Sequence, residues 1–150
     1  MPSYDSNNIF AKILRGELPC YKVYEDDKAL AFLDIMPRCM GHTLVIPKAP
    51  ARNILDIAPD DFAHVARGAQ KIATAAMKAF AADGMTVQQF SEPAGGQVVF
   101  HLHVHVIPRF KGEPPEPLPG QELPIAPAAE LDAMAAKIRA ALGAGAVAFK

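Results

Sequence analysis

Three of the five histidines in this 150-residue chain alternate with apolar residues, at His101, His103 and His105. On a β-strand this alternation places the three imidazoles on one face, roughly 6.6 Å apart at ~3.3 Å per residue. The opposite face would be apolar and would anchor the strand in the core: Leu102, Val104 and Val106. Burial of polar rings costs free energy unless each ring finds a partner, so a row of imidazoles indicates a chemical site rather than packing.

Three interpretations fit this row: a hydrogen-bonded histidine face without chemistry, a zinc or iron site, and a phosphate site with a nucleophilic histidine. The preceding residues favour the third. Gly95 and Gly96 allow the backbone to approach an anion closely, and Gln97 shares parity with His101, so its amide would lie on the histidine face. A neutral imidazole is available near pH 7 and can attack phosphorus, forming a phosphoramidate that water later cleaves.

The elements that must position this site follow from hydrophobic periodicity and from turn residues. The sequence predicts a helix over 9–14 capped by Asn7 or Asn8, and strands over 21–25, 29–33, 42–46, 85–90 and 98–107. It also predicts a long helix that begins at Pro59 and is ended by Asp83–Gly84, and a closing helix over 128–142. Pro108 is expected to close the last strand. Prolines recur between Gly112 and Pro127 and predict irregular structure there. Antiparallel strands with segregated helices define an α+β fold.

Composition narrows the class of protein. The chain is 51% hydrophobic and has a formal net charge of −1, and its length suits a single domain over 1–150. Without a basic stripe, it is not expected to bind nucleic acid or a membrane surface. Cys20 and Cys39 form no CxxC pair, and neither a signal peptide nor a membrane-spanning run is recognisable, so we expect a cytoplasmic protein.

The histidine run and Gln97 before it resemble the signature of the histidine triad (HIT) superfamily, in its Hint-like and fragile-histidine-like branches. The likeness covers about residues 8–110 and includes the segments 9–14, 31–35 and 41–48. It implies a five-stranded antiparallel sheet with a long helix and a short N-terminal helix, and a homodimer. Residues 111–150 would add the proline-rich segment and a C-terminal helix to this core.

The resemblance implies a role for each polar residue of the signature. His103 would attack the α-phosphorus of a nucleotide and carry the nucleotidyl group. His101 and His105 would hold phosphate oxygens and set the orientation of His103. His42 would lie near the phosphate and assist the leaving group, and Gln97 would donate to a phosphate or leaving-group oxygen.

The resemblance also implies a nucleoside site. Asp34 would accept hydrogen bonds from the ribose hydroxyls. An apolar slot would hold the base: Ile9, Phe10, Ile13, Phe32, Ile35 and Leu44. Two positions depart from the family pattern, because Ser91 stands where an asparagine usually lies near the ribose, and Val98 stands where many relatives carry Ser or Thr.

A metal is not expected to be required. Some bacterial relatives hold structural zinc through two cysteines and a histidine, and the corresponding positions here are Asn8, Ala11 and Pro50. Covalent catalysis by histidine needs no metal, although magnesium could accompany a polyphosphate substrate. A metal-dependent enzyme stays an alternative, since HxH spacing also suits zinc or iron.

The activity implied is hydrolysis of a purine nucleoside phosphoramidate or a dinucleoside polyphosphate through a nucleotidyl-His103 intermediate. The alternative is a non-catalytic module that uses the same site to sense nucleotides or bind a partner, which the Ser91 and Val98 departures favour. The sequence leaves base preference and leaving group open, because residues 111–150 match no family segment.

Overall fold

The computed structural model describes residues 1–114 and 123–143. In chain order the elements are α1 (Ile9–Leu14), β1 (Lys22–Glu25), β2 (Ala29–Leu33), β3 (Thr43–Pro47), α2 (Pro59–Phe80), β4 (Gly84–Gln88), the 3₁₀ turn η1 (Pro93–Gly95), β5 (Val104–Arg109) and α3 (Ala128–Leu142). The strands form one antiparallel sheet in the order β1-β2-β3-β5-β4. The predicted α+β fold with five antiparallel strands is confirmed.

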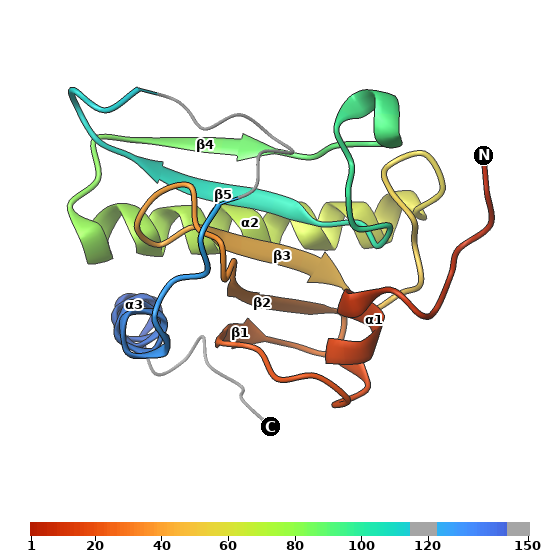
Figure 1. The fold of residues 1–150 in the computed structure, drawn as a ribbon, viewed down its shortest axis with the longest axis horizontal. Coiled ribbons are helices and arrows are strands. Elements are labelled where there is room, and N and C mark those ends of the chain that lie inside the picture. The colour runs from red at the N-terminus through yellow and green to blue at the C-terminus, as the bar shows by residue number, and fades with distance from the viewer. Residues whose placement is uncertain (115–122, 144–150) are drawn as a thin grey trace.

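The two faces of the sheet carry different layers (Figure 1). Alternation along β2 and β3 sends Ala31 and Val45 to the face that α2 covers, and sends Phe32 and Leu44 to the face on which α1 lies. The predicted anchor residues of the histidine run do pack on the α2 side: Leu102, Val104 and Val106. His105 pairs with Leu44 across the β3–β5 ladder, so its side chain lies on the same face of the sheet as Leu44 and α1.

Local signals explain both helices that flank the sheet. The Asn8 side chain accepts a hydrogen bond from the main-chain N–H of Ala11 at 2.9 Å, which makes it the N-cap of α1. Pro59 begins α2, where a missing N–H has no cost, and acidic residues follow it in the first turn. The predicted start of α2 is confirmed, but the helix ends at Phe80, before the predicted Asp83–Gly84, because Ala81 adopts the left-handed conformation.

The last strand departs from the prediction. We expected a strand over 98–107, but β5 begins only at Val104 and continues through Pro108. The residues before it find hydrogen-bond partners beyond the end of β3, because Leu102 N–H donates to Ala51 O at 2.8 Å. Pro108 is tolerated inside β5 because it lies past the last residue paired with β3, where the strand has β4 as its neighbour.

The C-terminal helix α3 matches the predicted range 128–142 and packs against α2 and β1. Its buried residues join the core on the α2 side: Leu131, Ala135 and Ile138. The predicted irregular segment 112–127 has no regular structure over 112–114 and 123–127, and the rest of it, like 144–150, lies outside the described residues. No helix in the described ranges is long and apolar enough to span a membrane.

Gly41, which precedes His42, provides a test of how the site is anchored to the fold. Its φ is +84°, and a Cβ built on it would overlap the ring of Phe80 at the end of α2. We predict that Gly41→Ala lowers the free energy of unfolding by roughly 2–4 kcal/mol, from left-handed strain and overpacking. Chemical denaturation measures the change. Gly84→Ala, where a Cβ meets open space, is the control, and equal losses in both variants would contradict the account.

Candidate active site

A cavity of about 810 Å³ opens on the face of the sheet opposite α2. The structure brings together nine of the predicted site residues in its wall: Ile9, Phe10, Ile13, Phe32, Asp34, Ile35, Leu44, His103 and His105. The apolar members come from α1, from β2 and the segment just after it, and from β3, and the two histidines come from β5 and the residue just before it. The cavity therefore combines an apolar lining with two imidazole rings.

His103 is held in one tautomer by its backbone surroundings. Its Nδ1 lies 2.7 Å from the main-chain oxygen of His101. A carbonyl oxygen can only accept, so Nδ1 carries the proton and Nε2 keeps its lone pair. Burial lowers the pKa of His103 to about 4, so the ring is neutral at pH 7. The Phe10 ring packs edge-on against it, with ring centroids 4.9 Å apart.

His101 does not reach the cavity, so its predicted contact with phosphate oxygens is not supported. The ring is fully buried, and both nitrogens have partners within the chain. Nε2 donates to Pro47 O at 2.9 Å, which leaves Nδ1 to accept from the Tyr4 hydroxyl at 2.6 Å. Asn8 donates to the same hydroxyl. These contacts fix His101, and with it the main-chain carbonyl that accepts from His103.

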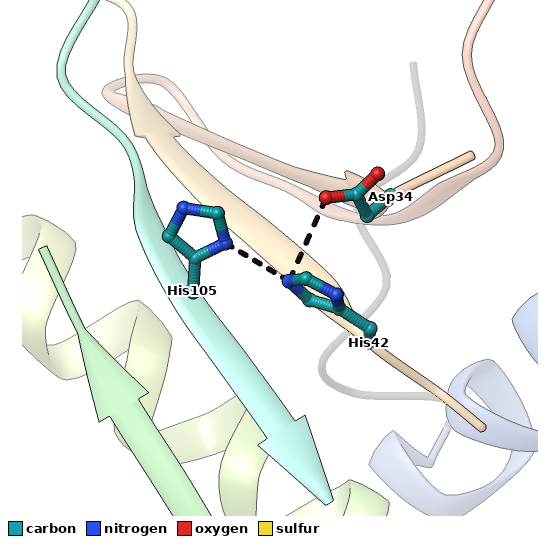
Figure 2. A group of neighbouring side chains, drawn as sticks. All are labelled: Asp34, His42 and His105. Atoms are coloured by element: carbon teal, nitrogen blue, oxygen red, sulfur yellow. Dashed lines mark hydrogen bonds and ion pairs between the residues drawn. The ribbon is translucent and has the colours of Figure 1, made fainter. Parts of the chain in front are cut away.

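His42 and His105 form a second chain of fixed tautomers. The main-chain N–H of Arg38 donates to His42 Nδ1 at 3.1 Å, so His42 carries its proton on Nε2. That proton is donated to His105 Nδ1 at 2.9 Å, which leaves the proton of His105 on Nε2 (Figure 2). Burial lowers the pKa of His105 to about 3 and holds that of His42 well below its usual range. His105 is therefore a neutral hydrogen-bond donor in the cavity wall.

His42 lies behind His105 rather than in the cavity wall, and its ring is fully buried. The expectation that it lies beside the phosphate and assists the leaving group directly is therefore not supported. Its contacts instead fix the ring orientation and protonation of His105, which makes it a positioning residue.

Asp34 follows β2 and lines the cavity between the apolar slot and the histidines. Its Oδ1 accepts from the main-chain N–H of Met36 at 2.9 Å, and its Oδ2 lies 3.6 Å from His42 Nε2. Figure 2 shows that the contacts of this carboxylate and of His105 meet at the same nitrogen of His42. Burial raises the pKa of Asp34, although the Met36 N–H and the charge of Arg38 oppose that shift.

The ligand atoms of Asp34, His42 and His105 lie within 4.8 Å of one another, as in many metal sites. The hydrogen bonds of His42 indicate that its Nε2 carries a proton rather than a metal ion. A metal on His42 Nε2 would move the imidazole proton to Nδ1, where it would face the N–H of Arg38.

A second group, formed by Asp26, Asp27 and His64 near the start of α2, contains a hydrogen bond of 2.8 Å between His64 Nε2 and Asp26.

Gln97 lies outside the cavity wall. The prediction that alternation along a strand would place its amide on the histidine face is therefore wrong. Residues 97–103 are not a strand, and the Gln97 side chain is buried with its hydrogen-bonding atoms occupied. Its Nε2 donates to the main-chain oxygens of Arg52 and Val99, at 2.7 and 3.0 Å. Its Oε1 accepts from the N–H of Glu92 and from Asn53 Nδ2. Gln97 therefore holds the loop that precedes the histidines, and donation to phosphate would require these bonds to break.

Ser91 also lies outside the wall, since its hydroxyl is hydrogen-bonded to the side chain of Gln89. Phe90 lines the cavity in its place, with its ring centroid 5.4 Å from that of His105. Val98 is 69% exposed and lies in the wall, so the position that carries a hydroxyl in many relatives is apolar here.

Several site residues could not be found from local sequence patterns. Tyr4 lies 97 positions from the histidine it contacts, and Arg38 is a single arginine in a loop. Leu123 and Ile125 reach the cavity wall from the segment before α3, which docks on the site through a 2.8 Å hydrogen bond from Ala126 N–H to Ile35 O. The proline-rich composition of this segment gave no sign of that docking.

The antiparallel sheet and the buried histidines at the start of β5 together define a histidine triad protein. Residues 15–112 match the HIT domain, and this chain belongs to that family. It is 45% identical over 107 residues to an uncharacterized HIT-like protein of Borreliella burgdorferi, covering 70% of this chain and 77% of that protein.

Other relatives extend the comparison. Adenylylsulfatase HINT3 of Arabidopsis thaliana is 41% identical over 101 residues, which are 67% of this chain and about half (51%) of that protein. A crystal structure of a HIT-like protein involved in cell-cycle regulation from Bartonella henselae, solved with an unknown ligand, is 51% identical with a TM-score of 0.86, covering 93% of this chain and 99% of that one. A zinc-bound histidine triad family protein from Mycobacterium smegmatis is 35% identical with a TM-score of 0.78, covering 91% and 93%.

The Tyr4 hydroxyl provides a test of the hydrogen-bond chain behind His103. Tyr4→Phe leaves the buried Nδ1 of His101 without a donor, so we predict a loss of roughly 1–3 kcal/mol in the free energy of unfolding. Urea denaturation followed by circular dichroism measures the loss. Tyr21→Phe is the control, because it removes a hydroxyl that takes no part in the hydrogen bonds behind His103. A Tyr4→Phe variant as stable as the wild type would show that the bond contributes nothing.

Proposed function

We propose that this chain is a nucleotide hydrolase that cleaves its substrate at the α-phosphorus through a covalent nucleotidyl-His103 intermediate. The observation that carries the proposal is the hydrogen bond from His103 Nδ1 to the carbonyl of His101, because it leaves the lone pair on Nε2 of a residue in the cavity wall. The candidate substrates are purine nucleoside phosphoramidates and dinucleoside polyphosphates. A crystal structure of a hypothetical histidine triad nucleotide-binding protein from Sulfolobus tokodaii, 34% identical with a TM-score of 0.80 over 89% of this chain and 90% of that one, supports a nucleotide ligand.

The chemistry follows from the fixed tautomers. The Nε2 lone pair of His103 forms a bond to phosphorus as the bond from phosphorus to the leaving group breaks. The leaving group departs with that electron pair, an acid as its anion and an amine after it takes up a proton from water. The imidazole then carries a positive charge, which the carbonyl of His101 stabilises through the Nδ1–H bond. His105 donates its Nε2–H to a non-bridging oxygen as negative charge develops there. Water then breaks the P–N bond, releases the nucleotide and restores the neutral ring.

The remaining wall residues would hold the nucleoside. The side chain of Asp34 is 15% exposed, and its carboxylate would accept hydrogen bonds from the ribose hydroxyls. The slot between Phe10, Phe32 and Leu44 is apolar and would take the base. Magnesium would enter only as a partner of a polyphosphate substrate. We further propose a homodimer formed through β4, an edge strand whose Val87 is 53% exposed.

Replacement of His103 provides the most direct functional test. His103→Ala should abolish turnover of a fluorogenic adenosine phosphoramidate and should abolish the covalent adduct seen by mass spectrometry of the wild type, with the fold retained. His64→Ala, on the surface of α2, is the matched control. Retained turnover in a folded His103→Ala variant would rule out this nucleophile. An adduct that forms in the wild type but turns over very slowly would favour the nucleotide-sensing alternative.

The lowered pKa of His103 predicts an unusual pH profile. The nucleophile must be neutral, and its pKa in the folded protein is about 4, so the neutral form persists far below the ordinary histidine value of about 6.5. We therefore expect kcat/KM to stay constant from pH 7 to about pH 5 and to fall as the pH passes through about 4. Steady-state rates across this range check the prediction. A loss of activity centred near pH 6.5 would show that the reactive imidazole is solvated.

A further inference from the structure

Arg38 is the one arginine or lysine among the described residues that line the cavity. It lies in the segment between β2 and β3, four residues before His42. Its main-chain N–H holds His42 in position, so the backbone at Arg38 is fixed to the histidine site. The guanidinium therefore extends from a segment that is already part of the catalytic architecture.

The guanidinium of Arg38 has an unmet requirement for an acceptor. Its Nε is buried and makes no hydrogen bond within the described part of the chain. No ion pair joins it to Asp34 or to another described carboxylate. Such a nitrogen costs free energy unless an acceptor comes from outside the chain. The planar fork of a guanidinium fits the oxygens of phosphate or sulfate.

Arg38 also supplies the positive charge that the histidines lack. Because burial keeps them neutral at pH 7, His103 and His105 can offer hydrogen bonds or a lone pair but no charge. The charge of Arg38 acts on His42 as well as on these two rings, so the guanidinium lies within electrostatic reach of the place where the reacting phosphate would sit. An anion bound beside this phosphate would meet a fixed cation.

We propose that Arg38 binds an anionic leaving group, so that the enzyme prefers substrates in which the α-phosphate is joined to a second acid such as sulfate or phosphate. This inference rests on the proposed function. As His103 Nε2 bonds to the α-phosphorus, the P–O bond to the second acid breaks, and that acid leaves with the electron pair as an anion. Its added negative charge develops beside Arg38, and no proton is needed. A neutral amine leaving group needs a proton and gains nothing from the cation.

Two substrates that share adenosine and the α-phosphate separate this role from general phosphate binding. Adenosine 5′-phosphosulfate loses sulfate, whereas adenosine 5′-phosphoramidate loses ammonia. We expect Arg38→Gln to lower kcat/KM for the phosphosulfate by roughly 10- to 100-fold, the range of a lost charge-assisted hydrogen bond, and to change the phosphoramidate value less than about 3-fold. Arg38→Lys keeps the positive charge without the planar guanidinium, so its kcat/KM for the phosphosulfate should lie between that of Arg38→Gln and that of the wild type. Arg67→Gln, an exposed arginine on α2, is the charge-matched control.

The outcomes distinguish the inference from the function on which it rests. Equal losses on the two substrates would place Arg38 on the α-phosphate and overturn the inference, as would unchanged rates on both. If Arg38→Gln unfolds at the same temperature as the wild type, a loss of kcat/KM is not caused by misfolding. A wild-type protein that turns over neither substrate would contradict the proposed function and the inference together.

Discussion

The chemistry of this site depends on one short hydrogen bond, from His103 Nδ1 to the main-chain oxygen of His101. A neutral imidazole has one proton, and this bond decides which nitrogen carries it. The other nitrogen is then free to act as a nucleophile. Because the acceptor is part of the backbone, no rotation of a partner side chain can remove it. The bond also stabilises the positive charge that the ring would carry after it bonds to phosphorus.

The fold secures this bond by ending the sheet early. β5 begins at Val104, so the residues before it are released from ladder pairing, and the His101 carbonyl is free to accept from a side chain two residues later. His101 is fixed in turn by Pro47 and by the hydroxyl of Tyr4. Leu102 anchors the same stretch in the core against α2. The irregular backbone is therefore held by contacts of side chains and loops instead of by strand pairing.

The sequence predicted the sheet and helices well because their signals are local. The N-cap of α1, the proline that begins α2, the apolar run of β2 and the spacing of apolar residues in α2 are all visible within windows of a few residues. The alternation along the histidine run predicted too long a strand for β5, since a pattern of polar and apolar residues does not reveal where the neighbouring strand ends.

The candidate site was predicted less completely, for a related reason. The apolar residues, Asp34 and His103 lie together in the wall of one cavity, but Gln97, Ser91, His101 and His42 are turned toward other partners within the chain. Such contacts join segments far apart in sequence, as Tyr4 and Arg38 also illustrate. Only the folded chain brings those groups together, and the types of residue alone do not identify them.

The central claim concerns a proton, and nitrogen NMR of the His103 ring observes it directly. In protein labelled with ¹⁵N at histidine, with His103→Asn used to assign the signal, the account predicts a neutral ring at pH 7 with its proton on Nδ1 and an unprotonated Nε2. A His103 signal typical of the opposite tautomer, or of a doubly protonated ring, would contradict the account, because no lone pair would then face the phosphorus.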